Sequence, residues 1–136
     1  MHSKQEAGVR IKVRFNECDP TGFAYNGNYF IWMQEAAVEC LRHGGIDMRG
    51  MASSNHTFVA VHYSCDFKKP VGFDDVVEAR ARLADVGESS FQLKYEILMD
   101  GEVVAVGKSV HVHIDTTTKT KMNISDELKR QLKSVM

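Results

Sequence analysis

The segment that decides the fold runs from Asn16 to Tyr29 and reads NECDPTGFAYNGNY. It follows a pattern that predicts a strand and precedes a pattern that predicts a long helix with few charged residues. Asp19 therefore lies in a tight turn beside the expected start of a helix. Unpaired N–H groups and the positive end of the helix dipole can polarise a carbonyl group at such a place. A neighbouring carboxylate can then act as a base or a nucleophile, so the segment predicts acyl-transfer chemistry.

The composition excludes several classes of protein. With 136 residues, 43% hydrophobic and 26% charged, the chain is expected to form one globular domain over residues 1–136, with residues 1–7 as a loose polar lead-in. The formal net charge of -1 argues against a nucleic-acid partner, because binding to phosphates needs a basic excess. No stretch reaches the roughly 20 apolar residues that span a bilayer, and no signal-peptide pattern begins the chain. We therefore expect no membrane partner.

The cysteines indicate a reducing compartment. Cys18, Cys40 and Cys65 are odd in number and lack the spacing of metal ligands, so we expect free thiols in a cytoplasmic protein. Cys18 is a weak candidate for a nucleophile, because the neighbouring Asp19 disfavours the thiolate form.

Alternating apolar and polar residues predict five strands, at residues 9–15, 58–67, 77–83, 91–99 and 102–114. The last two are joined by a hairpin turn at Asp100-Gly101. One face of the second strand is expected to carry Val59, Val61, Tyr63, Cys65 and Phe67. A helix is expected from about Asn28, as its N-cap, to about His43, and a short helix after Ser125. Residues 46–55 are expected to form an irregular loop.

The order of these elements predicts an α+β fold. The helix at residues 28–43 is apolar over most of its circumference, so we expect it to be buried against a sheet. An antiparallel five-stranded sheet wrapped around one long central helix, with a short C-terminal helix, accounts for all the elements. Because one helix cannot cover the whole sheet, the remaining apolar edge predicts self-association.

This plan resembles the hotdog fold, and the residues resemble those of the 4-hydroxybenzoyl-CoA thioesterase-like acyl-CoA thioesterases over residues 9–132. The likeness rests on three groups of residues: Asp19-Pro20-Thr21-Gly22, then Tyr25, Asn28, Tyr29 and Trp32 around the helix start, and the segment from Lys69 to Val77. The resemblance implies hydrolysis of an acyl-CoA thioester to the free acid and CoA. It also implies a homodimer or homotetramer that needs no metal and no cofactor.

The resemblance also implies site residues. Asp19 falls on the position of the family's catalytic aspartate. Asn26 lies where members often carry a histidine, so this chain keeps the backbone N–H but lacks a titratable ring. Thr57 falls where a second backbone donor comes across a dimer interface, and His56 and Phe58 would then border the acyl pocket.

The chemistry of thioesters fits so sparse a site. A thiolate leaves readily, with a model thiol pKa of about 8.5, so the reaction needs mainly a polarised carbonyl and either an activated water or attack by Asp19. The N–H groups near Asn26 and Gly27 would stabilise an oxyanion by roughly 3 kcal/mol for each well-placed donor. Since Gly27 has no Cβ, the acyl group can approach the backbone closely. The expected substrate-binding residues are Tyr25, Asn28, Tyr29, His56 and Phe58, together with Lys68 and Lys69 for the phosphates of CoA.

Simpler interpretations stand beside these. Asp19 can cap N–H groups of its own turn, and Glu35 can be a helix-borne catalytic acid or a subunit contact. Glu39 is expected to pair with Arg42 or His43. The pair His111 and His113 shares one strand face, and because no third ligand follows, solvated histidines are favoured over a metal site.

Two other functions remain open from the sequence. A thioesterase for acyl-carrier proteins would need a basic docking surface, whereas the charges here are mixed. A non-catalytic acyl-CoA-binding protein would bind the thioester without releasing a thiol. A hotdog dehydratase is disfavoured, because it would pair a histidine with the carboxylate and this chain has Asn26 instead.

Overall fold

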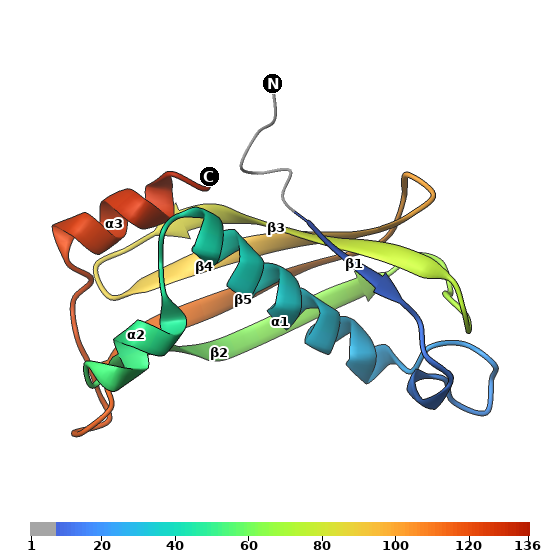
Figure 1. The fold of residues 1–136 in the computed structure, drawn as a ribbon, viewed down its shortest axis with the longest axis horizontal. Coiled ribbons are helices and arrows are strands. Elements are labelled where there is room, and N and C mark those ends of the chain that lie inside the picture. The colour runs from blue at the N-terminus through green and yellow to red at the C-terminus, as the bar shows by residue number, and fades with distance from the viewer. Residues whose placement is uncertain (1–7) are drawn as a thin grey trace.

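The computed structural model describes residues 8–136, and the expected lead-in of residues 1–7 lies outside them. An antiparallel sheet with the strand order β1-β3-β4-β5-β2 curls around the long helix α1, and the short strand β6 pairs with the end of β5 (Figure 1). The strands are β1 (Gly8–Lys12), β2 (His56–Phe67), β3 (Val76–Val86), β4 (Ser90–Met99), β5 (Glu102–Asp115) and β6 (Thr120–Lys121). The helices are α1 (Asn26–His43), α2 (Met48–Ser53) and α3 (Asp126–Lys133), and a 3-10 turn spans Phe15–Glu17.

The expected α+β plan is confirmed. The five long strands and α1 occur in the predicted order, and each pairing between neighbouring strands is antiparallel. At the β4–β5 hairpin, Asp100 and Gly101 have φ of 53° and 79°. Two successive positive φ angles are the geometry of the tight turn that the Asp-Gly pair predicts. The short helix also forms as expected, with the Ser125 hydroxyl accepting a hydrogen bond from the Leu128 N–H at 3.2 Å.

Several element boundaries differ from the prediction, including that of β3, which continues to Val86. The first strand ends at Lys12, and Phe15 is 77% exposed, because the chain turns into a 3-10 helix there instead of continuing the alternation. Helix α1 begins at Asn26, two residues before the expected N-cap. Part of the expected loop is the helix α2, whose first turn is capped by Asp47 through a 3.1 Å bond from the Arg49 N–H.

The predicted face of β2 is right for Tyr63, Cys65 and Phe67 but wrong for Val59 and Val61, because a bulge reverses the alternation. The register against β5 shifts between Ala60 and His62, and Val61 is 60% exposed. Before the bulge it is Phe58 that is buried, while after it Tyr63 and Cys65 pack against the core. A bulge places two residues opposite one, so every side chain beyond it changes face.

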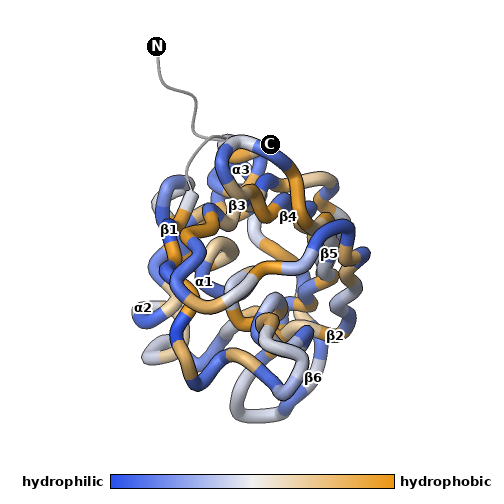
Figure 2. The backbone as a smooth tube through the Cα atoms, turned by 90° about the vertical axis from the view of Figure 1, so that its right-hand side faces the viewer, coloured by the Kyte–Doolittle hydropathy of each residue, from blue (hydrophilic) through white to orange (hydrophobic). Residues whose placement is uncertain are grey.

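The core lies between α1 and the concave face of the sheet. Trp32 and Met33 of α1 are buried and belong to one hydrophobic cluster with strand residues such as Leu83 and Ile97. Figure 2, turned by 90°, shows hydrophobic residues recurring along α1 and along the strands. The helix is less enclosed than predicted, since Ile31 is 50% exposed.

Helix α3 closes one end of this core. Leu132 and Val135 are fully buried, and the Leu83 N–H donates to the Val135 carbonyl at 3.0 Å. Within residues 8–136, none of the helices combines the length and the apolar character needed to cross a membrane.

Candidate active site

The turn before α1 fixes the position of Asp19. Gly22 N–H donates to the Asp19 carbonyl at 2.9 Å, and Asp19 N–H donates to the Phe23 carbonyl at 3.0 Å. Pro20 occupies the second position of this turn, and Gly22 follows with a φ of 88°, a left-handed conformation that favours glycine. The sequence Asp-Pro-Thr-Gly therefore folds locally into a rigid support for the carboxylate.

The carboxylate of Asp19 uses one oxygen for the turn and presents the other. Oδ1 accepts hydrogen bonds from the Thr21 N–H at 2.9 Å and from the Thr21 hydroxyl. These bonds lower the pKa of Asp19, with the hydroxyl contributing most. No donor among residues 8–136 reaches Oδ2. The local capping role predicted as the simpler interpretation is thus present, yet it leaves an ionised oxygen for chemistry.

The N-terminus of α1 is open. Tyr25 is its N-cap and provides no side-chain hydrogen bond, and the first turn contains no acidic residue. Within the described residues, the backbone N–H groups of Asn26 and Gly27 have no acceptor. Unsatisfied N–H groups at the positive end of a helix are available to a ligand oxygen that carries negative charge.

A pocket of about 360 Å³ brings Asp19 and the start of α1 together. Five of the residues that the sequence singled out line it: Asp19, Asn26, Tyr29, Lys68 and Lys69. The remaining lining residues were not predicted as site residues: Thr21, Phe23, Ala24, Phe67 and Pro70. Segments 67–70 and 19–29 meet here because the Ala24 N–H donates to the Val71 carbonyl at 2.7 Å.

The predicted substrate-binding residues in and around this pocket differ in the partners that they contact. Lys69 Nζ forms an exposed ion pair with Glu102 at 2.6 Å, whereas no ion pair among residues 8–136 engages Lys68. The Asn28 amide donates to the Glu17 carbonyl at 2.7 Å, which makes it an anchor of the turn. The exposed ring of Tyr25 lies over Gly27, and a Cβ on that glycine would come within 2.7 Å of it.

Glu17 holds this whole region against α1, and sequence reasoning missed it. Its buried carboxylate accepts from the Trp32 indole N–H at 3.1 Å, from the Arg14 N–H at 2.8 Å and from the Arg14 guanidinium at 3.0 Å. The hydrogen bonds and charge of Arg14 lower the pKa of Glu17 to about 2, against the opposing effect of burial. Glu17 stands two residues before Asp19, so these bonds fix the chain that enters the turn.

Thr57, His56 and Phe58 do not meet Asp19 within one protomer. They begin β2, whereas Phe67, at its other end, lines the pocket. At a rise of about 3.3 Å per residue, Thr57 and Phe67 are roughly 33 Å apart. Phe58 is buried, with its ring 4.7 Å from that of Phe91.

The two histidines of β5 are buried, so the expectation of solvated histidines is wrong. They face the concave side of the sheet, where His111 Nε2 lies 2.7 Å from the Ser109 hydroxyl and His113 Nε2 lies 2.8 Å from His56 Nδ1. Burial lowers the pKa of His111 to about 4 and lowers that of His113. Residues 8–136 contain no group of three or more metal-ligating side chains.

A chain of aromatic rings leads from the pocket along the inner face of β2. The ring centroid of Phe67 lies 4.9 Å from that of Tyr29 and 6.4 Å from that of Phe30. The ring centroid of Phe30 lies 6.2 Å from that of Tyr63. Tyr63 in turn stacks at 6.1 Å on Tyr95. The chain ends at a buried polar group, in which the Tyr95 hydroxyl lies 2.6 Å from the Ser109 hydroxyl.

Two further expectations are confirmed. The three cysteines are free, and Cys40 and Cys65 have a pKa raised by burial to about 11, which keeps both as thiols. Glu39 pairs with Arg42 at 2.5 Å, so this carboxylate is an ordinary helix-surface partner.

Comparison with known proteins matches residues 13–132 to the thioesterase-like superfamily. The chain is 28% identical over 123 residues to a 1,4-dihydroxy-2-naphthoyl-CoA hydrolase from Nostoc punctiforme, covering 90% of this chain and 83% of that protein. A hypothetical protein from Thermus thermophilus has a TM-score of 0.90 at 26% identity, covering 96% of this chain and 100% of that chain. The structure of a gentisyl-coenzyme A thioesterase has a TM-score of 0.85 at 25% identity, covering 93% and 99%. These likenesses confirm the expected hotdog fold and family.

Proposed function

Because the chain belongs to the thioesterase-like superfamily and is a thioester hydrolase, we propose that it hydrolyses acyl-CoA to the free acid and CoA at the pocket beside Asp19. The observation that carries the proposal is the pairing of an ionised aspartate with the open N-terminus of α1. One group supplies the electrons for attack on the thioester, and the other accepts the charge that develops on its oxygen.

The proposed role of α1 is to stabilise the oxyanion. The N–H groups of Asn26 and Gly27 have no other acceptor among residues 8–136, so a carbonyl oxygen can accept from them without displacing an existing bond. Each well-placed donor contributes roughly 3 kcal/mol to the stability of the transition state.

Two routes through Asp19 convert the same reactants, acyl-CoA and water, into the same products, the free acid and CoA. As a base, Asp19 takes a proton from water while the hydroxide attacks the carbonyl carbon, and the C–S bond then breaks to release CoA thiolate. As a nucleophile, an Asp19 oxygen attacks the carbon directly, the thiolate leaves, and water hydrolyses the mixed anhydride. Both routes need the ionised carboxylate, which the bonds from Thr21 favour.

Self-association would complete the site. Strand β2 lies at the edge of the sheet and offers a long unpaired side. Antiparallel pairing with a second copy would bring the partner's Thr57 end of β2 beside the Phe67 end, and hence toward the pocket of Asp19. We therefore propose a homodimer as the minimal active unit, with a homotetramer as a pair of such dimers. In it His56, Thr57 and Phe58 contribute across the interface.

The acyl group is proposed to be a hydroxylated aromatic acid. The names of the two similar thioesterases specify 1,4-dihydroxy-2-naphthoyl-CoA and gentisyl-CoA. In this chain, the rings of Phe23, Tyr29 and Phe67 that line the pocket offer flat apolar surfaces, and the Asn26 amide beside them offers hydrogen bonds. Such a lining favours an aryl ring with hydroxyl groups over a flexible alkyl chain. We also propose a cytoplasmic setting, which the three free cysteines support.

The experiment that tests this function measures thiol release from a panel of alkyl-CoA and hydroxyaryl-CoA thioesters, with acyl-carrier-protein thioesters alongside. Asp19→Asn is expected to lower turnover a hundredfold or more, a typical loss for a missing catalytic acid–base group. Asp115→Asn is the matched control, since Asp115 also accepts N–H bonds from a following threonine and lies outside the pocket. Equal turnover in the two variants would remove Asp19 from the mechanism, and binding without thiol release would favour the non-catalytic alternative.

A further inference from the structure

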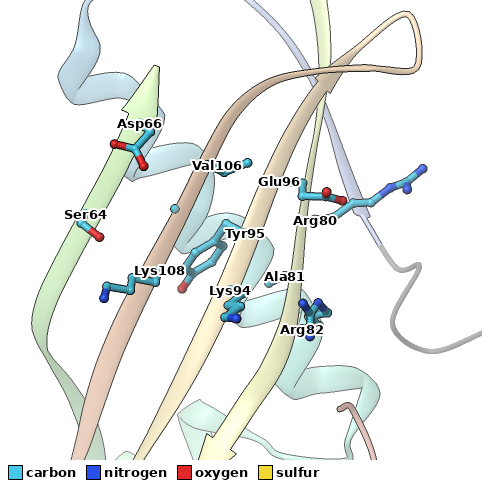
Figure 3. Close-up of a pocket in the computed structure, with 11 residues that line it drawn as sticks. Ser64, Asp66, Arg80, Ala81, Arg82, Lys94, Tyr95, Glu96, Val106 and Lys108 are labelled. Atoms are coloured by element: carbon cyan, nitrogen blue, oxygen red, sulfur yellow. The ribbon is translucent and has the colours of Figure 1, made fainter. Parts of the chain in front are cut away.

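The convex face of the sheet, opposite α1, contains a larger hollow than the one beside Asp19. Its volume is about 600 Å³, within the range of small-molecule sites. It crosses the four strands from β2 to β3, as Figure 3 shows. We name it the outer groove, and it is lined by Ser64, Asp66, Arg80, Ala81, Arg82, Lys94, Tyr95, Glu96, Val106, Gly107 and Lys108.

A row of positive charges runs across the outer groove. Arg82 lies directly opposite Lys94 in the β3–β4 register, and Lys94 lies directly opposite Lys108 in the β4–β5 register. Ser64 continues the row on β2, opposite Lys108. Directly opposite residues have Cβ atoms about 5 Å apart, so three cations stand close together in one line.

Nothing in residues 8–136 neutralises this row by a direct ion pair. Arg82, Lys94 and Lys108 are exposed and form no ion pair with any described carboxylate. The groove's own acids, Asp66 and Glu96, lie opposite Val106 in the adjacent row. Like charges placed directly opposite one another destabilise a sheet, so the row costs stability in the absence of a bound anion.

We infer that the outer groove binds the phosphate chain of a nucleotide-sized ligand with two or more phosphate groups. A single carboxylate would balance only one of the three cations, whereas consecutive phosphates present negative charge along a line, as the row presents positive charge. Arg82 offers a fork of N–H donors to phosphate oxygens, and the two lysines act as point charges. The Ser64 hydroxyl adds a neutral donor at the end of the row.

The site is separate from the pocket of Asp19, although the two share one strand. Asp66 lines the outer groove and Phe67 lines the pocket, so the two hollows lie on opposite faces of the end of β2. Two kinds of ligand carry such a phosphate chain: the phosphorylated nucleotide of CoA itself, and an independent nucleotide such as ADP.

The test uses the full chain and inorganic pyrophosphate as the probe, with affinity measured by titration calorimetry. Lys94→Gln/Lys108→Gln is expected to weaken pyrophosphate binding roughly a hundredfold, about tenfold for each charge-assisted contact removed. Lys121→Gln/Lys133→Gln carries the same change of charge at two exposed lysines outside the groove, and should bind like the wild type. Absence of pyrophosphate binding to the wild type, or equal affinity in the two double variants, would overturn the inference.

Thermal unfolding provides a second readout that needs no turnover. Because Lys94→Gln/Lys108→Gln removes repulsion, its unfolding midpoint without ligand should equal or exceed that of the wild type. Pyrophosphate should raise the midpoint of the wild type and leave that of the double variant unchanged. A rise of the same size in both would contradict the site. Neither readout depends on the chemistry of Asp19, so the groove and the proposed function can fail separately.

Two further measurements distinguish the sources of the phosphates. If the nucleotide of CoA occupies the groove, Lys94→Gln/Lys108→Gln should raise the KM for acyl-CoA and leave that for acyl-pantetheine, which lacks phosphates, unchanged. If an independent nucleotide does so, ADP should bind with the same dependence on Lys94 and Lys108, and both KM values should stay as in the wild type.

Discussion

Asp19 shows how a short turn can set the charge of one side chain. Its Oδ1 atom receives two hydrogen bonds from Thr21, and these stabilise the ionised form and lower the pKa. The lowered pKa of Asp19 can be detected in the pH dependence of kcat/KM. A group that works as a carboxylate becomes active as the pH rises through its pKa, so a lowered pKa extends activity toward acid.

Thr21→Val should narrow this pH range. The variant removes the hydroxyl donor but keeps the backbone N–H, so the pKa of Asp19 should rise and the acid limb of the kcat/KM profile should move to higher pH. The pH–rate profile is measured with one acyl-CoA. Thr118→Val, which removes a hydroxyl from the neighbourhood of Asp115, should leave that limb in place. A limb that stays fixed or moves to lower pH in Thr21→Val would show that Asp19 does not control it.

At the level of single residues, the sequence could predict those features of the site that depend on residues close together in the chain. The turn of Asp19, its position beside a helix start and its company of Asn26 and Tyr29 in one pocket all follow from neighbouring residues. Thr21 could have been found as well, because an aspartate commonly accepts a hydrogen bond from the residue two places on. Glu17 could not, since its burial depends on Trp32, fifteen positions away, donating an indole N–H to it.

At the scale of elements, the approach of α1 to the sheet depends on a glycine. A Cβ on Gly107 of β5 would come within 2.5 Å of the Met33 Cε atom and 2.6 Å of the Ser64 carbonyl oxygen. The methionine end can move, but the carbonyl belongs to the backbone of β2. The smallest possible side chain is therefore required where the helix crosses the sheet.

Gly107→Ala should destabilise the protein by about 1–3 kcal/mol, the usual cost of overpacking a core. The measurement is the free energy of unfolding in urea. Gly87→Ala is the control, because its added Cβ would meet only ordinary contacts, the nearest at 3.5 Å from the Ser90 hydroxyl. If the two variants lost the same stability, the close approach at Gly107 would not limit the packing.

Periodicity predicted the elements better than their ends and their faces. The four later strands and the buried side of α1 follow from alternation and helical spacing, which are local signals. The bulge between Ala60 and His62 reverses the face of β2. No local signal in the sequence marks this bulge, because it depends on how β2 pairs with β5. Helix α2 was missed because its six residues include Gly50 and Ser53, which rarely favour a helix.

At the scale of the whole molecule, pairing through the exposed edge of β2 would bring Thr57 of one protomer toward Asp19 of another. The protomer holds these residues near opposite ends of a twelve-residue strand. Pairing of two such edges about a twofold axis would bring unlike ends together and form two equivalent sites. Near that axis, Val61 and His62 would lie close to their own copies.

Val61→Glu should separate the protomers. Two glutamates facing one another across the axis would repel, so sedimentation should show a monomer, and turnover should fall with it. Circular dichroism should show that the protomer keeps its fold, since Val61 is 60% exposed. Val76→Glu, at another exposed apolar position, should keep the oligomer. A fully active Val61→Glu monomer would refute the shared site.

The most direct measurement of the central claim is a crystal structure of Asp19→Asn with an uncleaved acyl-CoA. The account predicts that the thioester oxygen accepts hydrogen bonds from the N–H groups of Asn26 and Gly27, while the carbonyl carbon faces the side chain at position 19. A thioester bound away from the start of α1, with those N–H groups pointing into solvent, would contradict it.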